Sequence, residues 1–241
     1  MKVMKLFPAV LLTVVPAIAA AQPEAVDTVG WGHAVAAVPD RTFEIAVATG
    51  YAQGGGKLGG TLGSLEDVAG PGAAVEVDLG YRIIPQLTVG VYGALARSQH
   101  GDQIDSNTDV LGASAGVQAA WHFRPHVSID PWVSLGGGWR ALWLNPGAGK
   151  VTSLQGFDVA RLQLGVDYRV TKEIAIAPVI GGSASLFVSQ DSPMTTSYAE
   201  IADKKVNFTG FVGLSGRFDF GGAERARESA ARHDASQEAW Q

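Results

Sequence analysis

The sequence predicts an all-β fold, specifically an eight-stranded antiparallel up-and-down transmembrane β-barrel. Apolar and polar side chains alternate with period two through most of the chain, which is the pattern of strands with two different faces. The connections between the alternating segments are short and long in turn. Every long apolar stretch beyond the N-terminus is broken by Gly, Pro or a charge, so none is predicted to be a transmembrane helix. If the chain spans a membrane, it must therefore do so as a closed barrel, because only helices and closed barrels satisfy all their backbone groups in lipid.

The composition excludes several classes of protein. The chain has 241 residues and no cysteine, so no disulfide framework or thiolate metal site can form. Only 17% of the residues are charged and the net charge is −5, whereas 31 residues are glycine. This balance argues against a basic nucleic-acid binder and against a charged disordered chain, and we expect no nucleic-acid partner.

The N-terminus has the pattern of an export signal. Lys2 and Lys5 precede an apolar run over residues 6–18, and small residues at Ala19 and Ala21 fit the cleavage rule. The alternative is a membrane-anchoring helix, but the run is shorter than the roughly 20 residues that a span needs. We therefore predict a signal peptide over residues 1–21.

Residues 22–40 are small, polar and flanked by proline, and are predicted to be a periplasmic linker. The barrel is predicted over residues 41–220, where eight segments alternate. The predicted strands are Thr42–Tyr51, Val75–Ile83, Leu87–Arg97, Val110–Phe123, Ser128–Trp143, Phe157–Val170, Ile174–Ser189 and Val206–Phe220.

The regularity differs between these segments. Val75–Ile83 is the clearest, because Val, Val, Leu, Tyr and Ile alternate with Glu, Asp, Gly and Arg. Ile174–Ser189 is the least regular, because Val179 and Phe187 fall on its small-residue face. Each strand is at least about as long as the 9–11 residues that cross a bilayer when tilted.

The connections predict which end of the barrel is which. Three are tight turns, at residues 84–86, 124–126 and 171–173, and four are long loops, at residues 52–72, 99–107, 145–155 and 190–204. In outer-membrane barrels the short turns are periplasmic and the long loops are extracellular. An even number of strands then leaves both ends of the barrel chain on the periplasmic side.

Alternation alone does not separate a membrane barrel from a soluble barrel with an apolar interior. The non-apolar face here consists mostly of Gly, Ala and Ser with a balanced set of carboxylates and guanidiniums, and no predicted strand contains Lys. We therefore assign this face to a narrow lumen closed by a salt-bridge network, in preference to an open channel. The predicted lumen charges are Glu44, Glu76, Asp78, Arg82, Asp130, Arg140, Arg161, Asp167, Arg169 and Arg217.

Aromatic residues gather near the strand ends, as expected for the two interfacial girdles of a membrane barrel. Near the turns and the end of the last strand lie Tyr81, Trp121, Phe123, Tyr168, Phe218 and Phe220. Near the long loops lie Tyr51, Trp143, Phe157 and Phe208.

The chain from Arg41 to Phe220 resembles the small outer-membrane barrels of the OmpA transmembrane-domain, OmpX and OmpW type. The last strand, Phe211–Phe220, alternates apolar residues and ends on Phe, like the C-terminal signal of that class. The resemblance implies a location in the outer membrane of a Gram-negative bacterium, contact with its lipid and lipopolysaccharide, and recognition of this strand by the outer-membrane assembly machinery. One departure is the polar tail at residues 221–241, which follows the terminal aromatic residue.

The strongest catalytic candidate in the sequence is His126 with Ser128 and Asp130, which invites comparison with an outer-membrane lipid A deacylase. His126 falls in a predicted periplasmic turn, whereas that enzyme works at the outer leaflet. We therefore predict no catalytic residues and no enzyme activity.

Nothing in the sequence predicts a metal site or a cofactor. The histidines other than His126, namely His33, His100, His122 and His233, are scattered, and the loop acids Asp102, Asp105 and Asp109 lack the spacing of a calcium loop. Gly54–Lys57 is not followed by a helix pattern, so it is no phosphate loop. Gly136–Gly138 is interpreted as a bend or close backbone approach in the barrel wall.

Three functions are compatible with this pattern. The first is a non-enzymatic structural or surface-interaction role, in which the extracellular loops meet an external ligand. The second is a narrow transporter or pore for small apolar solutes, and the third, least favoured, is a lipid A-modifying enzyme.

Overall fold

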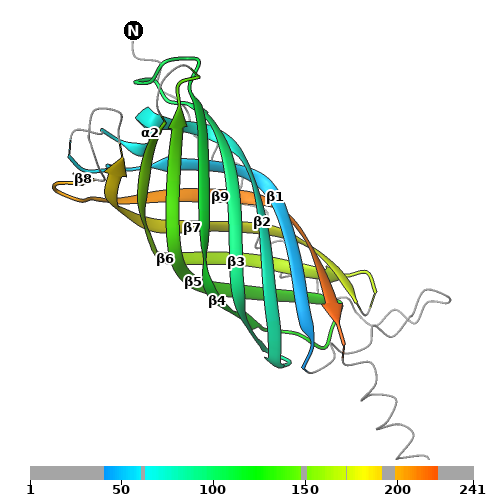
Figure 1. Ribbon diagram of the computed structural model, residues 1–241. Helices are drawn as coiled ribbons and strands as arrows, with labels where there is room; N and C mark the ends of the chain where they lie inside the picture. Colours follow the sequence, from blue (N-terminus) through cyan, green and yellow to red (C-terminus); the bar gives the residue numbers. More distant parts are fainter. Residues whose placement is uncertain (1–40, 61–62, 148–150, 172, 192–198, 222–241) are drawn as a thin grey trace, which may run out of the picture. The chain divides into compact units, whose positions relative to one another are not determined.

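The computed structural model describes five parts of the chain, residues 41–60, 63–147, 151–171, 173–191 and 199–221 (Figure 1). The predicted signal peptide with Ala19 and Ala21, the linker, and the tail beyond Gly221 lie outside the described residues. Among the described residues, no helix is long and apolar enough to cross a membrane.

Eight long strands and one very short strand make up the described fold. The long strands are β1 (Phe43–Gly55), β2 (Ala69–Ile84), β3 (Leu87–His100), β4 (Asp109–His122), β5 (Ile129–Asn145), β6 (Thr152–Arg169), β7 (Ile174–Asp191) and β9 (Val206–Phe220). The two-residue strand β8 (Ala199–Glu200) pairs with the end of β7, and a four-residue helix, α2 (Leu65–Val68), precedes β2. The long strands contain 13 to 18 residues, enough to cross a bilayer at a tilt.

The sheet closes on itself. Each long strand pairs antiparallel with its neighbour along the chain, and β1 also pairs with β9 from Phe43↔Phe220 to Gly55↔Phe208. Figure 1 shows the tilted strands wrapped around a common axis, with β1 in blue beside β9 in orange. The predicted eight-stranded antiparallel barrel is therefore confirmed, with β8 as a small addition at its rim.

Turns and loops lie at opposite ends of the barrel. Of the residues that the structure describes between strands, 85–86, 123–128, 170–171 and 173 lie at the turn end, and 56–60, 63–68, 101–108, 146–147, 151 and 201–205 lie at the loop end. The predicted bounds of the first loop, 52–72, were too wide, because the ladder continues to Ala52↔Gly72 on one side of β1 and Gly55↔Phe208 on the other. Glycine and alanine carry no alternating pattern there, but their backbones still pair.

The alternation separates an apolar exterior from a small and charged interior. On β2, the side chains of Val75, Val77 and Leu79 are 40–50% exposed, whereas Glu76 between them is 4% exposed. The same division holds on the irregular strand β7, where Val179 and Phe187 lie inside. The apolar face therefore points outward, as predicted for a membrane barrel.

A bulge in β6 interrupts this alternation. The pairing with β5 shifts between Gly136 and Gly138, and the pairing with β7 shifts between Asp158 and Ala160. Val159 is consequently exposed beside Ala160, while Asp158 and Arg161 on either side both point inward. A Cβ atom added at Gly136, Gly137 or Gly138, opposite the bulge, would lie 3.0 Å or less from a backbone oxygen of a neighbouring strand. This is the close backbone approach predicted for Gly136–Gly138.

Two glycines provide a matched test of this packing. A Cβ atom at Gly138 would lie 2.2 Å from the carbonyl oxygen of Ala115, whereas one at Gly93 would meet nothing within 4 Å. We expect Gly138→Ala to lower the free energy of unfolding by about 1–3 kcal/mol, because the two strands must separate. Gly93→Ala should change it by less than about 1 kcal/mol. Urea unfolding of the barrel in lipid vesicles, followed by tryptophan fluorescence, measures both, and equal effects would contradict the close approach.

Candidate functional site

The interior of the barrel is the first candidate site, and its side chains form three layers. The turn-side network is defined by Glu44, Arg82, His122, Asp130, Trp132, Asp167, Arg169, Arg217 and Asp219. The loop-side network is defined by Glu76, Asp78, Tyr92, Gln118, Arg140, Asp158, Arg161 and Gln163. The mouth cluster is apolar and consists of Leu58, Leu65, Val68, Ala69, Val110, Leu142, Leu154, Phe187 and Ile201.

Ion pairs dominate the turn-side network. Arg82 pairs with Glu44 across β2 and β1, and Arg169 Nη1 lies 2.7 Å from Asp219 Oδ2. These charged side chains are almost completely buried, so each charge is stabilised by its oppositely charged partner and not by water.

Arg217 is the centre of this network. Its Nη1 donates to Asp167 Oδ2 at 2.6 Å, and its guanidinium lies 5.2 Å from the ring centre of Trp132. The indole of Trp132 donates in turn to Asp167 Oδ1 at 2.8 Å. The carboxylate of Asp167 on β6 thereby joins an arginine from β9 to a tryptophan from β5.

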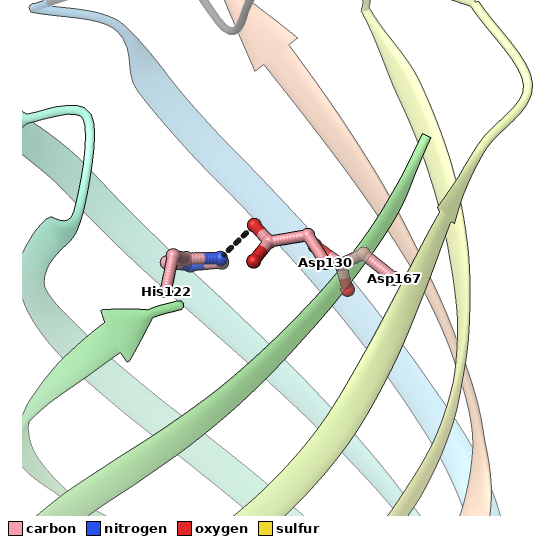
Figure 2. Close-up of side chains that lie close together, drawn as sticks. All are labelled: His122, Asp130 and Asp167. Carbon is pink, nitrogen blue, oxygen red and sulfur yellow. Dashed lines mark hydrogen bonds and ion pairs between the residues drawn. The ribbon is translucent and has the colours of Figure 1, made fainter. Parts of the chain in front are cut away.

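His122, Asp130 and Asp167 come together at the end of β4 and on β5 and β6 (Figure 2). Their potential ligand atoms lie within 4.8 Å of one another, and His122 Nδ1 lies 2.7 Å from Asp130 Oδ2. The expectation that the histidines are scattered is thus wrong for His122, because the antiparallel register places its strand end beside two acidic residues.

The geometry of this cluster does not fit a metal ion. Arg217 Nη1 lies 3.0 Å from His122 Nε2 and 2.6 Å from Asp167 Oδ2, so a guanidinium already stands between two of the three ligands. Because arginine can only donate, His122 Nε2 accepts and Nδ1 carries the proton that is donated to Asp130. The cluster is therefore a hydrogen-bond relay that holds the turn-side network together.

The catalytic candidate of the sequence is not assembled. His126 is exposed in the turn at residues 123–128, whereas Asp130 is fully buried and hydrogen-bonded to His122. Ser128 is half-buried in the same turn. The three side chains therefore do not form a nucleophile, base and orienting acid.

The loop-side network fills the middle of the barrel. Arg161 pairs with Glu76, and its guanidinium lies 4.3 Å from the ring centre of Tyr92. Gln163 donates to Glu76 Oε1 at 3.0 Å, and Gln118 donates to Asp78 Oδ1 at 2.8 Å. Strands on opposite sides of the bore are thus joined by direct contacts.

Arg140 joins three further strands in this network. Its Nη1 lies 3.2, 2.8 and 2.7 Å from the hydroxyls of Ser183, Ser185 and Thr209, and its Nε lies 3.5 Å from Asp158. Asp158 was absent from the predicted lumen charges. The alternation of β6 after residue 160 would place Asp158 on the outer face, but the extra residue at Val159 shifts the alternation and turns Asp158 inward.

All ten predicted lumen charges lie inside, and the structure adds Asp158, Asp219 and His122. Five arginines pair one to one with five carboxylates: Arg82 with Glu44, Arg140 with Asp158, Arg161 with Glu76, Arg169 with Asp219, and Arg217 with Asp167. Asp78 and Asp130 instead have the neutral side chains of Gln118 and His122 as partners. The lumen is therefore mixed in sign and paired within itself, unlike a pore lined by one charge.

Little space is left between these side chains. Two small cavities of about 40 and 70 Å³ lie within the networks, next to Asp78 and to Arg140 respectively. Cavities of this size hold a few water molecules.

The mouth cluster covers the networks at the loop end. Leu65 of α2 packs over Gly54, and Leu58 is completely buried. Ser64 anchors the start of α2, because its backbone N–H and hydroxyl both donate to Asp67 Oδ2, which lowers the pKa of the Asp67 carboxyl. The apolar residues of this loop thus close the bore from the outside.

The exterior is the second candidate surface. All of the predicted girdle aromatics point outward; Tyr81 and Trp143 are half-buried and the others are exposed. Phe43, which was not among the predicted girdle residues, is 64% exposed at the turn end, and its ring centre lies 5.0 Å from that of Tyr81. Between the two groups of aromatics, none of the outward side chains that the structure describes carries a charge.

Comparison with known proteins identifies the fold. No protein-family model and no curated protein sequence matches the chain. Among solved structures, Neisserial surface protein A is similar with a TM-score of 0.52 and 17% identity, over 74% of this chain and 97% of that one. The outer-membrane protein OprG of Pseudomonas aeruginosa has a TM-score of 0.46 and 10% identity, over 76% and 99% of the two chains. The first of these similarities shows that the chain has the fold of a small outer-membrane barrel.

Two neighbouring acids on β2 test the pairing in the lumen. We expect Glu76→Gln to lower the free energy of unfolding by about 3–5 kcal/mol, because Arg161 would remain buried without its carboxylate. Asp78→Asn removes no arginine partner and should change it by less than about 1 kcal/mol. Equilibrium unfolding in lipid vesicles compares the two variants, and a larger loss from Asp78→Asn would refute the one-to-one pairing.

Proposed function

We propose that this protein resides in the outer membrane as a non-conducting, non-enzymatic barrel that acts through its outward surface and its loops. The observation that carries the proposal is the contrast between the two faces of the wall. The outer face presents an uncharged apolar belt between aromatic residues, which is the surface that a bilayer requires. The inner face is filled by paired charges under an apolar cover.

The filled lumen favours a surface role over passage through the bore. A solute would have to displace the mouth cluster and then separate ion pairs in two successive networks. An eight-stranded barrel is only wide enough for its side chains to fill it, so little room could be gained by rotamer changes alone. The partners of such a protein are the lipids around the belt, the assembly machinery that reads β9, and a ligand outside the cell.

A transport role for small apolar solutes is the second candidate. The apolar mouth cluster favours it, because such a solute could enter there without desolvating a charge. The buried charges beneath the cluster oppose it, because the same solute would next meet the loop-side network, in which Glu76, Asp158 and Arg161 are almost completely buried. Measurement of passage through the bore separates the two candidates.

We expect the purified full chain to insert into planar bilayers without stepwise ion conductance. The variant Leu58→Ser with Leu65→Ser should also stay silent, because the two charged networks fill the bore below the mouth cluster. Heat-modifiable migration on SDS gels is the folding control for both proteins.

A steady conductance of the folded wild-type protein would contradict the closed lumen. Conductance in the double variant alone would show that the mouth cluster is the only barrier, and would favour the transport role. Recovery of the native protein from the soluble periplasm, with none in the outer-membrane fraction, would overturn the proposed location.

A further inference from the structure

A groove crosses the outer face of the barrel at the loop end. It has a volume of about 920 Å³ and lies between the upper parts of β1, β2 and β3 and the segment at residues 106–109. Tyr51, Ala73 and Arg97 line the barrel side, and Asn107 and Thr108 line the loop side. Its volume falls within the range of about 300–1,000 Å³ that ligand sites occupy.

The strand register fixes the height of this groove. Tyr51 pairs with Ala73, and Ala73 pairs with Arg97, so the three outward residues form one row across β1, β2 and β3. The next outward row toward the turn end includes Val75 and Leu95, which are 49% and 59% exposed. The groove therefore begins where the apolar belt ends, at the level at which lipid headgroups meet a membrane barrel.

Arg97 is the cation of the groove. Its side chain is 74% exposed, and its Nη2 lies 2.7 Å from Asp109 Oδ1. Asp109 thus orients one edge of the guanidinium, while the exposed remainder of the planar fork suits a phosphate group.

Besides Asp109, neutral polar groups lie near this cation in the groove. Gln99, Ser106 and Asn107 are exposed in the groove wall and offer amide and hydroxyl groups. Thr108 also lines the groove but is only 6% exposed, and its hydroxyl oxygen is enclosed by the protein, so it is not one of the groups offered to a ligand. A ligand with many hydroxyls and at least one phosphate matches this combination of groups.

We propose that the groove binds the phosphorylated sugar headgroup of an outer-leaflet glycolipid. Arg97 contacts a phosphate, and the exposed side chains of Gln99 and Asn107 contact sugar hydroxyls. The acyl chains of the same lipid continue down the apolar belt past Val75 and Leu95. This inference rests on the proposed location in the outer membrane and adds a defined lipid site to it.

The test uses the full chain folded in detergent and purified lipid A, a phosphorylated disaccharide lipid, as the probe. Native mass spectrometry measures the bound fraction over a range of lipid concentrations. The variant is Arg97→Ala, and the matched control is Lys205→Ala, because Lys205 is also exposed at the loop end and also pairs with a neighbouring acid, Asp203, at 2.8 Å.

We expect Arg97→Ala to weaken lipid A binding about tenfold, the effect of losing one hydrogen bond to a charged group. Lys205→Ala should leave it within about twofold. Asn107→Ala should weaken binding of lipid A with and without its phosphates alike, whereas Arg97→Ala should matter only for the phosphorylated form.

Equal binding by Arg97→Ala and Lys205→Ala would overturn the assignment of this groove. So would an Arg97→Ala effect of the same size on dephosphorylated lipid A, because the arginine would then not contact a phosphate. Heat-modifiable migration and outer-membrane fractionation of each variant report separately on folding and location, so failure of the lipid site and failure of the proposed function are distinguishable.

Discussion

The constraint on which the rest of the structure depends is closure of the sheet between β1 and β9. In a hydrocarbon environment no water is present to satisfy an open strand edge, so every backbone donor and acceptor must find its partner inside the sheet. The ladder from Phe43↔Phe220 to Gly55↔Phe208 satisfies this requirement along the whole length of β1. The small interior residues, including Ala46, Ala48 and Gly50, let the wall close tightly around a narrow bore.

Closure at this width in turn determines the chemistry of the interior. The side chains of opposite walls meet, so each buried arginine contacts a carboxylate instead of bulk water. Arg217 lies between His122 and Asp167, so a guanidinium already occupies the group of potential metal ligands found among the described residues. The interior therefore stabilises the closed barrel, and the surfaces that remain for ligands are the loops, the apolar belt and the groove beside Arg97.

Much of this fold could be predicted from the sequence, because a wall between lipid and lumen imposes a period of two. Val75–Ile83 alone shows the strand, its outward face and its two lumen acids. The prediction failed where the local sequence does not determine which face of the wall a residue occupies or how two strands are aligned. Asp158 was missed because one extra residue at Val159 moves it to the inner face, and the extension of β1 was missed because its glycines have no pattern. The meeting of His122 with Arg217, 95 residues apart, depends on the shear of the closed barrel, which no local pattern encodes.

The central claim is that β1 and β9 close the barrel, and a cross-strand disulfide tests it most directly. The chain has no cysteine, so introduced pairs report without interference. Thr49 pairs with Leu214 across the closure and with Val75 on the other side of β1. Such directly opposed residues in an antiparallel sheet lie about 4.5–5.5 Å apart between Cα atoms, within disulfide reach.

In lipid vesicles under mild oxidation, Thr49→Cys with Leu214→Cys should form an intrachain disulfide as completely as Thr49→Cys with Val75→Cys. A disulfide in the second pair but not in the first would mean that the sheet is open, and would contradict this account.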